Sequence, residues 1–169
     1  MEVKGAALLY TLATLAVTFA GFAALLVMLR QSAGSALSAL DRFLTRTVVS
    51  HLSVIAAGAL LPPILTLYGL PELLVWKIAA VVFGLPLLAM LFSYGHRRHA
   101  ATGKPAPPMI MVVFVGVGAL SLVAMIAAIF LGLAPPAAVY TTALTVNFLT
   151  LAFAFVVALE VILRQDAKG

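Results

Sequence analysis

The sequence has no cysteine and only five acidic residues among its 169 positions. Without cysteine the chain can form neither disulfides nor thiolate metal sites. Its two aspartates, Asp41 and Asp166, lie outside the apolar parts of the chain, and no Gly-rich phosphate loop, H-E-x-x-H or G-x-S-x-G motif occurs. The usual signatures of hydrolases and phosphotransferases are therefore missing, which favours a protein without enzyme activity and leaves a membrane enzyme as an alternative; no cofactor is predicted.

The chain is instead dominated by long apolar stretches. Hydrophobic residues make up 64% of it, charged residues make up 9%, and the mean hydropathy is +1.22. A helix needs about 20 apolar residues to cross the ~30 Å hydrocarbon core of a bilayer. Five stretches are long enough: residues 6–29, 47–70, 73–94, 109–133 and 137–163. The sequence predicts an all-α, polytopic transmembrane bundle of five helices, forming a single domain over residues 1–169.

Lysine and arginine are concentrated in alternate gaps between these stretches. Eight of the ten basic residues follow the first stretch, the third stretch or the fifth: Arg30, Arg42, Arg46, Arg97, Arg98, Lys104, Arg164 and Lys168. The positive-inside rule assigns that side to the cytoplasm, with the N-terminus outside and the C-terminus inside. The first stretch is too long for the apolar core of a signal peptide. Most of the basic residues beside it follow it, whereas those of a signal peptide precede the core. We therefore expect that this segment is not cleaved.

The net charge of +5 therefore follows the predicted topology. It indicates contact with anionic lipid headgroups and gives little support to nucleic-acid binding. Between the first two stretches, Ser38 and Asp41 have the spacing of a capping box. We expect either a short interfacial amphipathic segment over residues 38–46 or an inward extension of the second helix. Headgroup contacts are predicted for four arginines: Arg42, Arg46, Arg97 and Arg98. A docking surface for a cytoplasmic partner is the alternative.

Small and polar residues recur at three- and four-residue spacing along the first and fifth stretches. Those with hydrogen-bonding side chains are Thr11, Thr14, Thr18, Asn147 and Thr150. Asn147 lies near the predicted middle of the bilayer. In lipid, small residues allow close approach of helices, and Thr and Asn bond across them. We interpret these faces as packing seams; a narrow polar path past Asn147, as in a small channel or carrier, is the alternative.

Charged residues within the third and fifth stretches have structural explanations. Lys77 lies about one turn inside the third stretch, where its amine can reach the interface and pair with Glu72. Its neighbour Trp76 fits an interfacial aromatic belt. Glu160 precedes Arg164 by four residues, the spacing of a helical ion pair. We predict that pair at the inner interface, with a proton-relay carboxylate at Glu160 as the alternative.

Three histidines lie near the predicted cytoplasmic side: His51, His96 and His99. Imidazoles at one membrane level can ligate a metal ion or haem, which would make the protein a haem- or metal-binding membrane subunit. No carboxylate in a suitable position completes a facial triad, and Arg97 and Arg98 would repel a cation. We therefore predict no metal site, with His51 as a hydrogen-bonded packing residue and the other two as interfacial anchors.

Two short motifs resemble those of a known group of proteins. The run TFAGFAALLVMLR occupies residues 18–30, DRFLTRT occupies residues 41–47, and Trp76 stands early in the third stretch. Together they resemble a group of small, uncharacterised bacterial integral membrane proteins along most of the chain. The resemblance implies a bacterial inner-membrane location and carries no known activity. We expect a structural or accessory membrane component that associates with itself or with a membrane partner.

Overall fold

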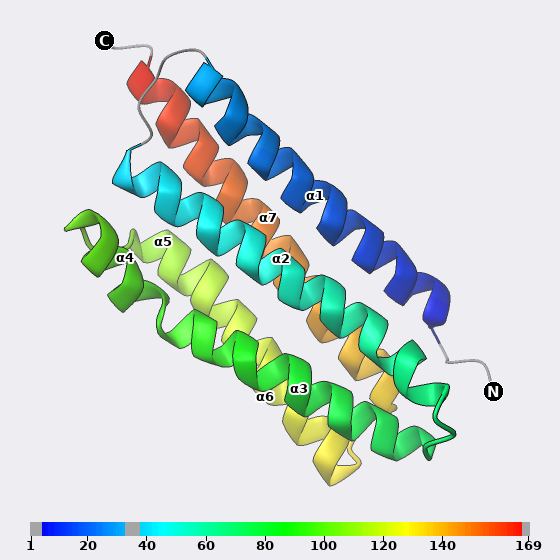
Figure 1. The fold of residues 1–169 in the computed structure, drawn as a ribbon. Coiled ribbons are helices and arrows are strands. Elements are labelled where there is room, and N and C mark those ends of the chain that lie inside the picture. Colours follow the sequence, from blue (N-terminus) through cyan, green and yellow to red (C-terminus); the bar gives the residue numbers. More distant parts are fainter. Residues whose placement is uncertain (1–4, 33–37, 167–169) are drawn as a thin grey trace.

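Five helices are long and apolar enough to cross a membrane. The structure is a computed structural model that describes residues 5–32 and 38–166, with side chains described as far as Val157. The spanning helices are α1 (Ala6–Ser32), α2 (Ala39–Thr66), α3 (Glu72–Phe92), a composite fourth span (Pro108–Leu131) and α7 (Pro136–Asp166). They run side by side along one long axis (Figure 1). The predicted five-helix membrane bundle is confirmed, and the described residues contain no strand.

The second helix begins earlier than the hydrophobic pattern predicts, at Ala39 and not at residue 47. The predicted capping box explains this start. The Ser38 hydroxyl accepts a hydrogen bond from the Asp41 N–H at 3.1 Å, and the Asp41 carboxylate accepts one from the Ser38 N–H at 3.0 Å. Both bonds satisfy backbone donors that a helix start leaves free. Residues 38–46 are therefore the capped beginning of α2, not a separate interfacial helix.

A short helix that the sequence did not predict, α4 (Tyr94–Thr102), follows α3 and turns away from its axis (Figure 1). Gly103 ends α4 with a φ of +68°, a left-handed conformation that glycine adopts without steric cost. The fourth span then begins with α5 (Pro108–Ile110), continues as the π-helical segment η1 (Met111–Val117) and ends as α6 (Gly118–Leu131). Single π-helical turns are rare and often lie at functional sites.

An aromatic cluster fills the core at the end where α3 begins. The Trp76 and Tyr140 rings lie 5.4 Å apart, and the Phe83 and Tyr140 rings lie 5.7 Å apart. All three side chains are buried. Trp76 is thus a core residue, and its predicted place in an interfacial aromatic belt is wrong. The Tyr140 hydroxyl also donates a 2.7 Å hydrogen bond to the Gly58 carbonyl, which joins α7 to α2.

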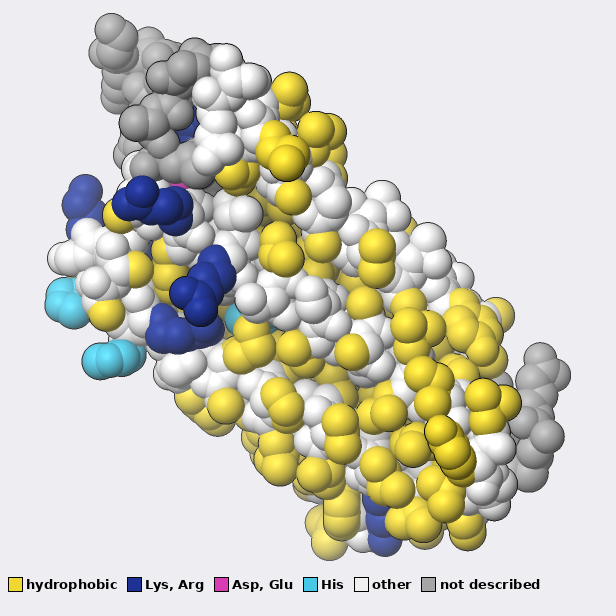
Figure 2. All heavy atoms as spheres, in the orientation of Figure 1, with side chains coloured by type: hydrophobic (Ala, Val, Ile, Leu, Met, Phe, Trp, Pro, Cys, Tyr) yellow, Lys and Arg dark blue, Asp and Glu magenta, His cyan; other side chains and the backbone are white. Residues whose placement is uncertain are grey.

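The outer surface separates apolar and charged side chains (Figure 2). Hydrophobic side chains cover most of the visible face, whereas Lys, Arg and His gather where α1 ends, α2 begins and α4 lies. We call this part of the bundle the basic end. At the opposite end the Lys77 amine lies over the Phe130 ring, 5.3 Å from its centroid. No ion pair between Lys77 and Glu72 occurs among the described residues.

Candidate functional site

Asn147 lies in the contact between α6 and α7, where it is 3% exposed. Its side-chain amide donates to the Ser121 hydroxyl at 2.9 Å and to the Ala143 carbonyl at 2.8 Å. The Thr150 hydroxyl donates in turn to the Asn147 carbonyl at 3.1 Å. A Cβ atom at Gly118 would lie 3.1 Å from the Asn147 side-chain oxygen, so the absence of a side chain there allows the close approach. This geometry is that of a packing contact between helices.

The three threonines of α1 lie elsewhere. Thr11, Thr14 and Thr18 are exposed on the outer face of the helix, together with Ala7 and Gly21. Thr11 and Thr14 bond to backbone carbonyls of α1 itself, at 2.9 Å each. The face of α1 that enters the bundle carries other residues: Leu9, Leu12, Ala13, Ala16 and Ala23. The predicted seam of α1 is therefore not a contact within the described chain, and these threonines do not join Asn147 in a polar path.

The three histidines are also separated. His51 is 1% exposed in α2, with its Nδ1 atom 2.9 Å from the Thr47 carbonyl and its ring 5.1 Å from that of Phe114. This agrees with a hydrogen-bonded packing histidine, although its Nε2 atom is buried without a partner. His96 and His99 are exposed on α4. No group of three His, Asp or Glu side chains in the described part of the chain could hold a metal ion.

The four arginines assigned to headgroups differ in their surroundings. Arg42 and Arg46 are exposed on α2. Arg97 is half-buried, and its Nη2 atom donates to the Met90 carbonyl at 2.9 Å, close to the break between α3 and α4. Arg98 is only 9% exposed, which is unusual for an arginine. The Nε atoms of Arg97 and Arg98 are both buried without an acceptor.

No acidic side chain among the described residues forms an ion pair with Arg97 or Arg98. Asp41 forms an ion pair with Arg30 at 3.2 Å, which joins the end of α1 to the beginning of α2. The sequence analysis did not predict this pair, although both residues lie between the first two apolar stretches. Glu160 and Arg164 belong to α7, but their side chains lie outside the described residues, so their predicted ion pair stays a prediction.

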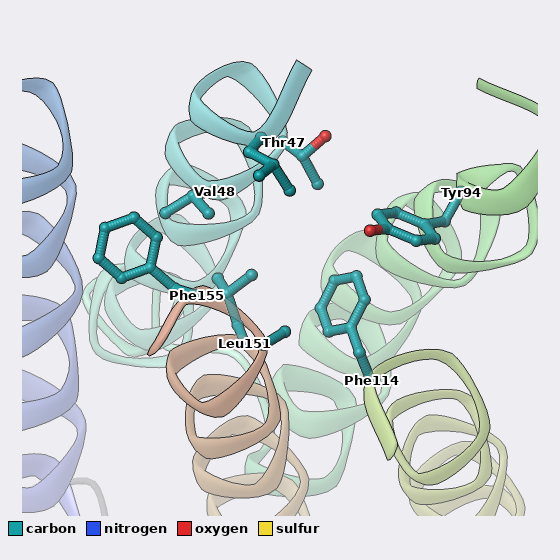
Figure 3. A pocket seen from close by; sticks show the side chains of 8 residues that line it. Thr47, Val48, Tyr94, Phe114, Leu151 and Phe155 are labelled. Atoms are coloured by element: carbon teal, nitrogen blue, oxygen red, sulfur yellow. The ribbon is translucent and has the colours of Figure 1, made fainter. Parts of the chain in front are cut away.

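A small cavity lies beneath α4, among α2, α4, η1 and α7 (Figure 3). Its volume is about 20 Å³, enough for about one water molecule. Thr47, Tyr94, Phe114 and Leu151 line it, and in Figure 3 the Tyr94 hydroxyl points toward its centre. Aromatic contacts surround it, with Tyr94 lying 5.4 Å from Phe114 and 5.5 Å from Phe43 between ring centroids. These contacts hold α4 against the bundle and fix the backbone that carries Arg97 and Arg98.

Sequence reasoning missed α4, η1 and the bond between Tyr140 and Gly58. One signal for the bond was present. Pro62 stands four residues after Gly58 and has no N–H, so the Gly58 carbonyl lacks its helical donor. The break at Ser93 is followed by Gly95 and His96, but neither residue alone predicts that the chain forms a further helix in a new direction.

Comparisons with other proteins add no activity. No protein-family model, curated protein or solved structure matches the chain. The resemblance to small bacterial membrane proteins therefore stays a prediction, and the geometry alone carries the functional argument.

Proposed function

We propose that the protein is a structural or accessory component of a bacterial inner membrane and that it associates with a second copy of itself through the outer face of α1. The proposed orientation places the basic end in the cytoplasm, with the N-terminus outside. Support for this orientation comes from the concentration of Lys and Arg at one end of the bundle, in accordance with the positive-inside rule.

The observation that carries the self-association proposal is the outer face of α1. Of the apolar window of α1, 22% is buried, against 39–44% in the other four spanning helices. The exposed face carries small and hydroxyl residues at three- and four-residue spacing: Ala7, Thr11, Thr14, Thr18 and Gly21. A Cβ atom added at Gly21 would meet nothing within 4 Å. Such faces support close helix contacts in lipid, where burial of apolar side chains gives no driving force of its own.

The surroundings of Asn147 favour this proposal over a carrier. A substrate path would need the polar groups of Asn147 to face the substrate, whereas its amide hydrogens bond to Ser121 and Ala143. The haem or metal alternative has less support, because the buried His51 and the exposed His96 and His99 have different surroundings.

The absence of cysteine provides a direct experiment. Thr14→Cys and Thr18→Cys change the side chain little on the proposed contact face, and Leu120→Cys is a matched control at an exposed site on α6. We expect mild oxidation of native membranes to give disulfide-linked dimers of one or both α1 variants and little dimer of the control. Failure of both α1 variants to cross-link, or equal cross-linking of the control, would overturn self-association through this face.

A further inference from the structure

Arg98 combines burial with a lack of any partner. It is 9% exposed, and its guanidinium makes no hydrogen bond or ion pair with another residue in the part of the chain that the structure describes. Its neighbour Arg97 contributes a second buried Nε atom without an acceptor. Each of these two arginines therefore has a buried Nε–H without an acceptor among the described residues, whereas the terminal nitrogens of Arg98 are not among the buried unpartnered atoms.

Burial makes this arrangement costly for the protein alone. Burying part of a guanidinium loses hydration that a hydrogen-bonded counter-charge replaces best. Water can accept a hydrogen bond from the N–H, but it leaves the positive charge uncompensated. Asp41 already pairs with Arg30. An anion from outside the chain would both accept the hydrogen bonds and neutralise the charge.

The position of α4 points to the class of anion. The helix lies at the basic end, beyond the apolar body of the bundle, where lipid headgroups meet a membrane protein (Figures 1 and 2). Arg42, Arg46 and Lys104 at the same end are exposed, so they meet anions as solvated charges and contribute little to binding at one site. Arginine binds phosphate particularly well, because its planar donors can engage two oxygens at once.

The Arg97 side chain and the backbone of α4 are positioned by contacts within the protein. The Arg97 Nη2 atom donates a 2.9 Å hydrogen bond to the Met90 carbonyl at the end of α3. Arg98 lies one helical turn after Tyr94, whose ring contacts Phe43 and Phe114. At the other end of α4, the Gly103 N–H bonds to the His99 carbonyl at 2.8 Å and closes the helix.

We propose that Arg98, assisted by Arg97, binds the phosphate of an anionic phospholipid headgroup at the basic end. This inference is independent of self-association through α1. It separates Arg98 from Arg42 and Arg46, which are exposed and contact headgroups only as solvated charges. A free phosphate ion has the same chemistry, and the experiment distinguishes the two sources.

The test uses thermal unfolding of the full chain in an uncharged detergent. Arg98→Met removes the buried charge, and Arg42→Met removes an exposed one from the same end as a matched control. Phosphatidylglycerol at ~100-fold its dissociation constant should raise the unfolding temperature of the wild type and of R42M by about 5 °C or more. R98M should gain less than about 1 °C under the same conditions. Without lipid, R98M should be at least as stable as the wild type, because it lacks the uncompensated charge.

Two further additions identify the ligand. Diacylglycerol, which lacks the phosphate, should not stabilise the wild type. Equal stabilisation by diacylglycerol, or equal stabilisation of R98M and the wild type by phosphatidylglycerol, would overturn the proposal. If inorganic phosphate alone produces the whole effect, the lipid source is wrong and the site belongs to free phosphate.

A second measurement is needed if R98M does not fold. Failure of R98M to fold would itself contradict an uncompensated charge at this site. Native mass spectrometry counts phosphatidylglycerol molecules retained by the wild type and by Arg97→Gln. We expect retention to fall about tenfold in R97Q, since loss of one charge-assisted contact weakens binding by roughly that factor. Equal retention by the two proteins would overturn the assignment of Arg97 as the assisting residue. If R98M also fails to fold, equal retention would overturn the proposal as a whole.

Discussion

The hydrogen bond from Tyr140 to Gly58 offers the sharpest test of how the bundle is held together. Tyr140 is fully buried, and its hydroxyl lies 2.7 Å from the Gly58 carbonyl. In a regular helix that carbonyl would accept from the N–H of residue 62, but Pro62 has none. A carbonyl buried in a membrane bundle cannot accept a hydrogen bond from water instead. The tyrosine of α7 therefore satisfies an acceptor that a proline exposes in α2.

Replacing Tyr140 by Phe removes the hydroxyl and leaves the ring in its aromatic cluster. We expect a loss of about 1–2 kcal/mol in the free energy of unfolding, because the Gly58 carbonyl is left without a partner. The assay is reversible unfolding in mixed micelles, followed by circular dichroism. Tyr10→Phe is the matched control: Tyr10 is exposed on α1, and its substitution should change stability by less than about 0.5 kcal/mol.

A double-mutant cycle separates this explanation from a simple loss of packing. Pro62→Ala restores an N–H at residue 62, so the Gly58 carbonyl can again accept the helical bond. In the P62A background the cost of Y140F should fall to about half or less, even if P62A itself alters the shape of α2. An undiminished cost of Y140F in that background would refute the link between the proline and the tyrosine.

Two further predictions concern polar contacts that the structure describes. Asn147→Leu removes the hydrogen bond to Ser121 between α6 and α7. It should lower the free energy of unfolding in mixed micelles by about 1 kcal/mol and leave the bundle folded. Complete loss of the fold would contradict a packing role. Ser38→Ala removes the hydroxyl that caps α2 and should cost about 1 kcal/mol, with increased amide hydrogen exchange confined to the first turn of the helix. Exchange that rises throughout α2 instead would show that the cap supports more than the helix start.

The spanning helices could be predicted because their signal is simple. An uninterrupted run of about 20 apolar residues crosses a bilayer whatever its neighbours are, and only helices satisfy the backbone there. The capping box at the start of α2 could also be predicted from the sequence, because Ser38 and Asp41 form a local motif that needs no tertiary contact. Helix ends elsewhere depended on tertiary contacts: α3 ends at Phe92, and Tyr94 then begins α4 among rings from α2 and η1.

Which face of a helix enters the bundle was harder to predict. In a soluble protein the polar face points to water, but in a bilayer both faces are apolar and the contrast is lost. Thr14 of α1 and Asn147 of α7 both stand in small-residue stripes, yet the first is exposed and the second is buried. The difference lies in the partner surface. Asn147 meets Ser121 and the bare backbone of Gly118, neither of which is visible from the sequence of α7.

The arginines of the basic end show why charge counting alone does not locate a site. The positive-inside rule depends on the number of basic residues near the ends of the spans, and burial plays no part in it. Arg42 satisfies that rule while exposed, and Arg30 satisfies it while paired with Asp41. Arg98 gains nothing for topology by being buried and carries a desolvation cost that exposure would avoid. Its burial therefore needs a reason other than topology, and binding of an anion supplies one that stability measurements can test.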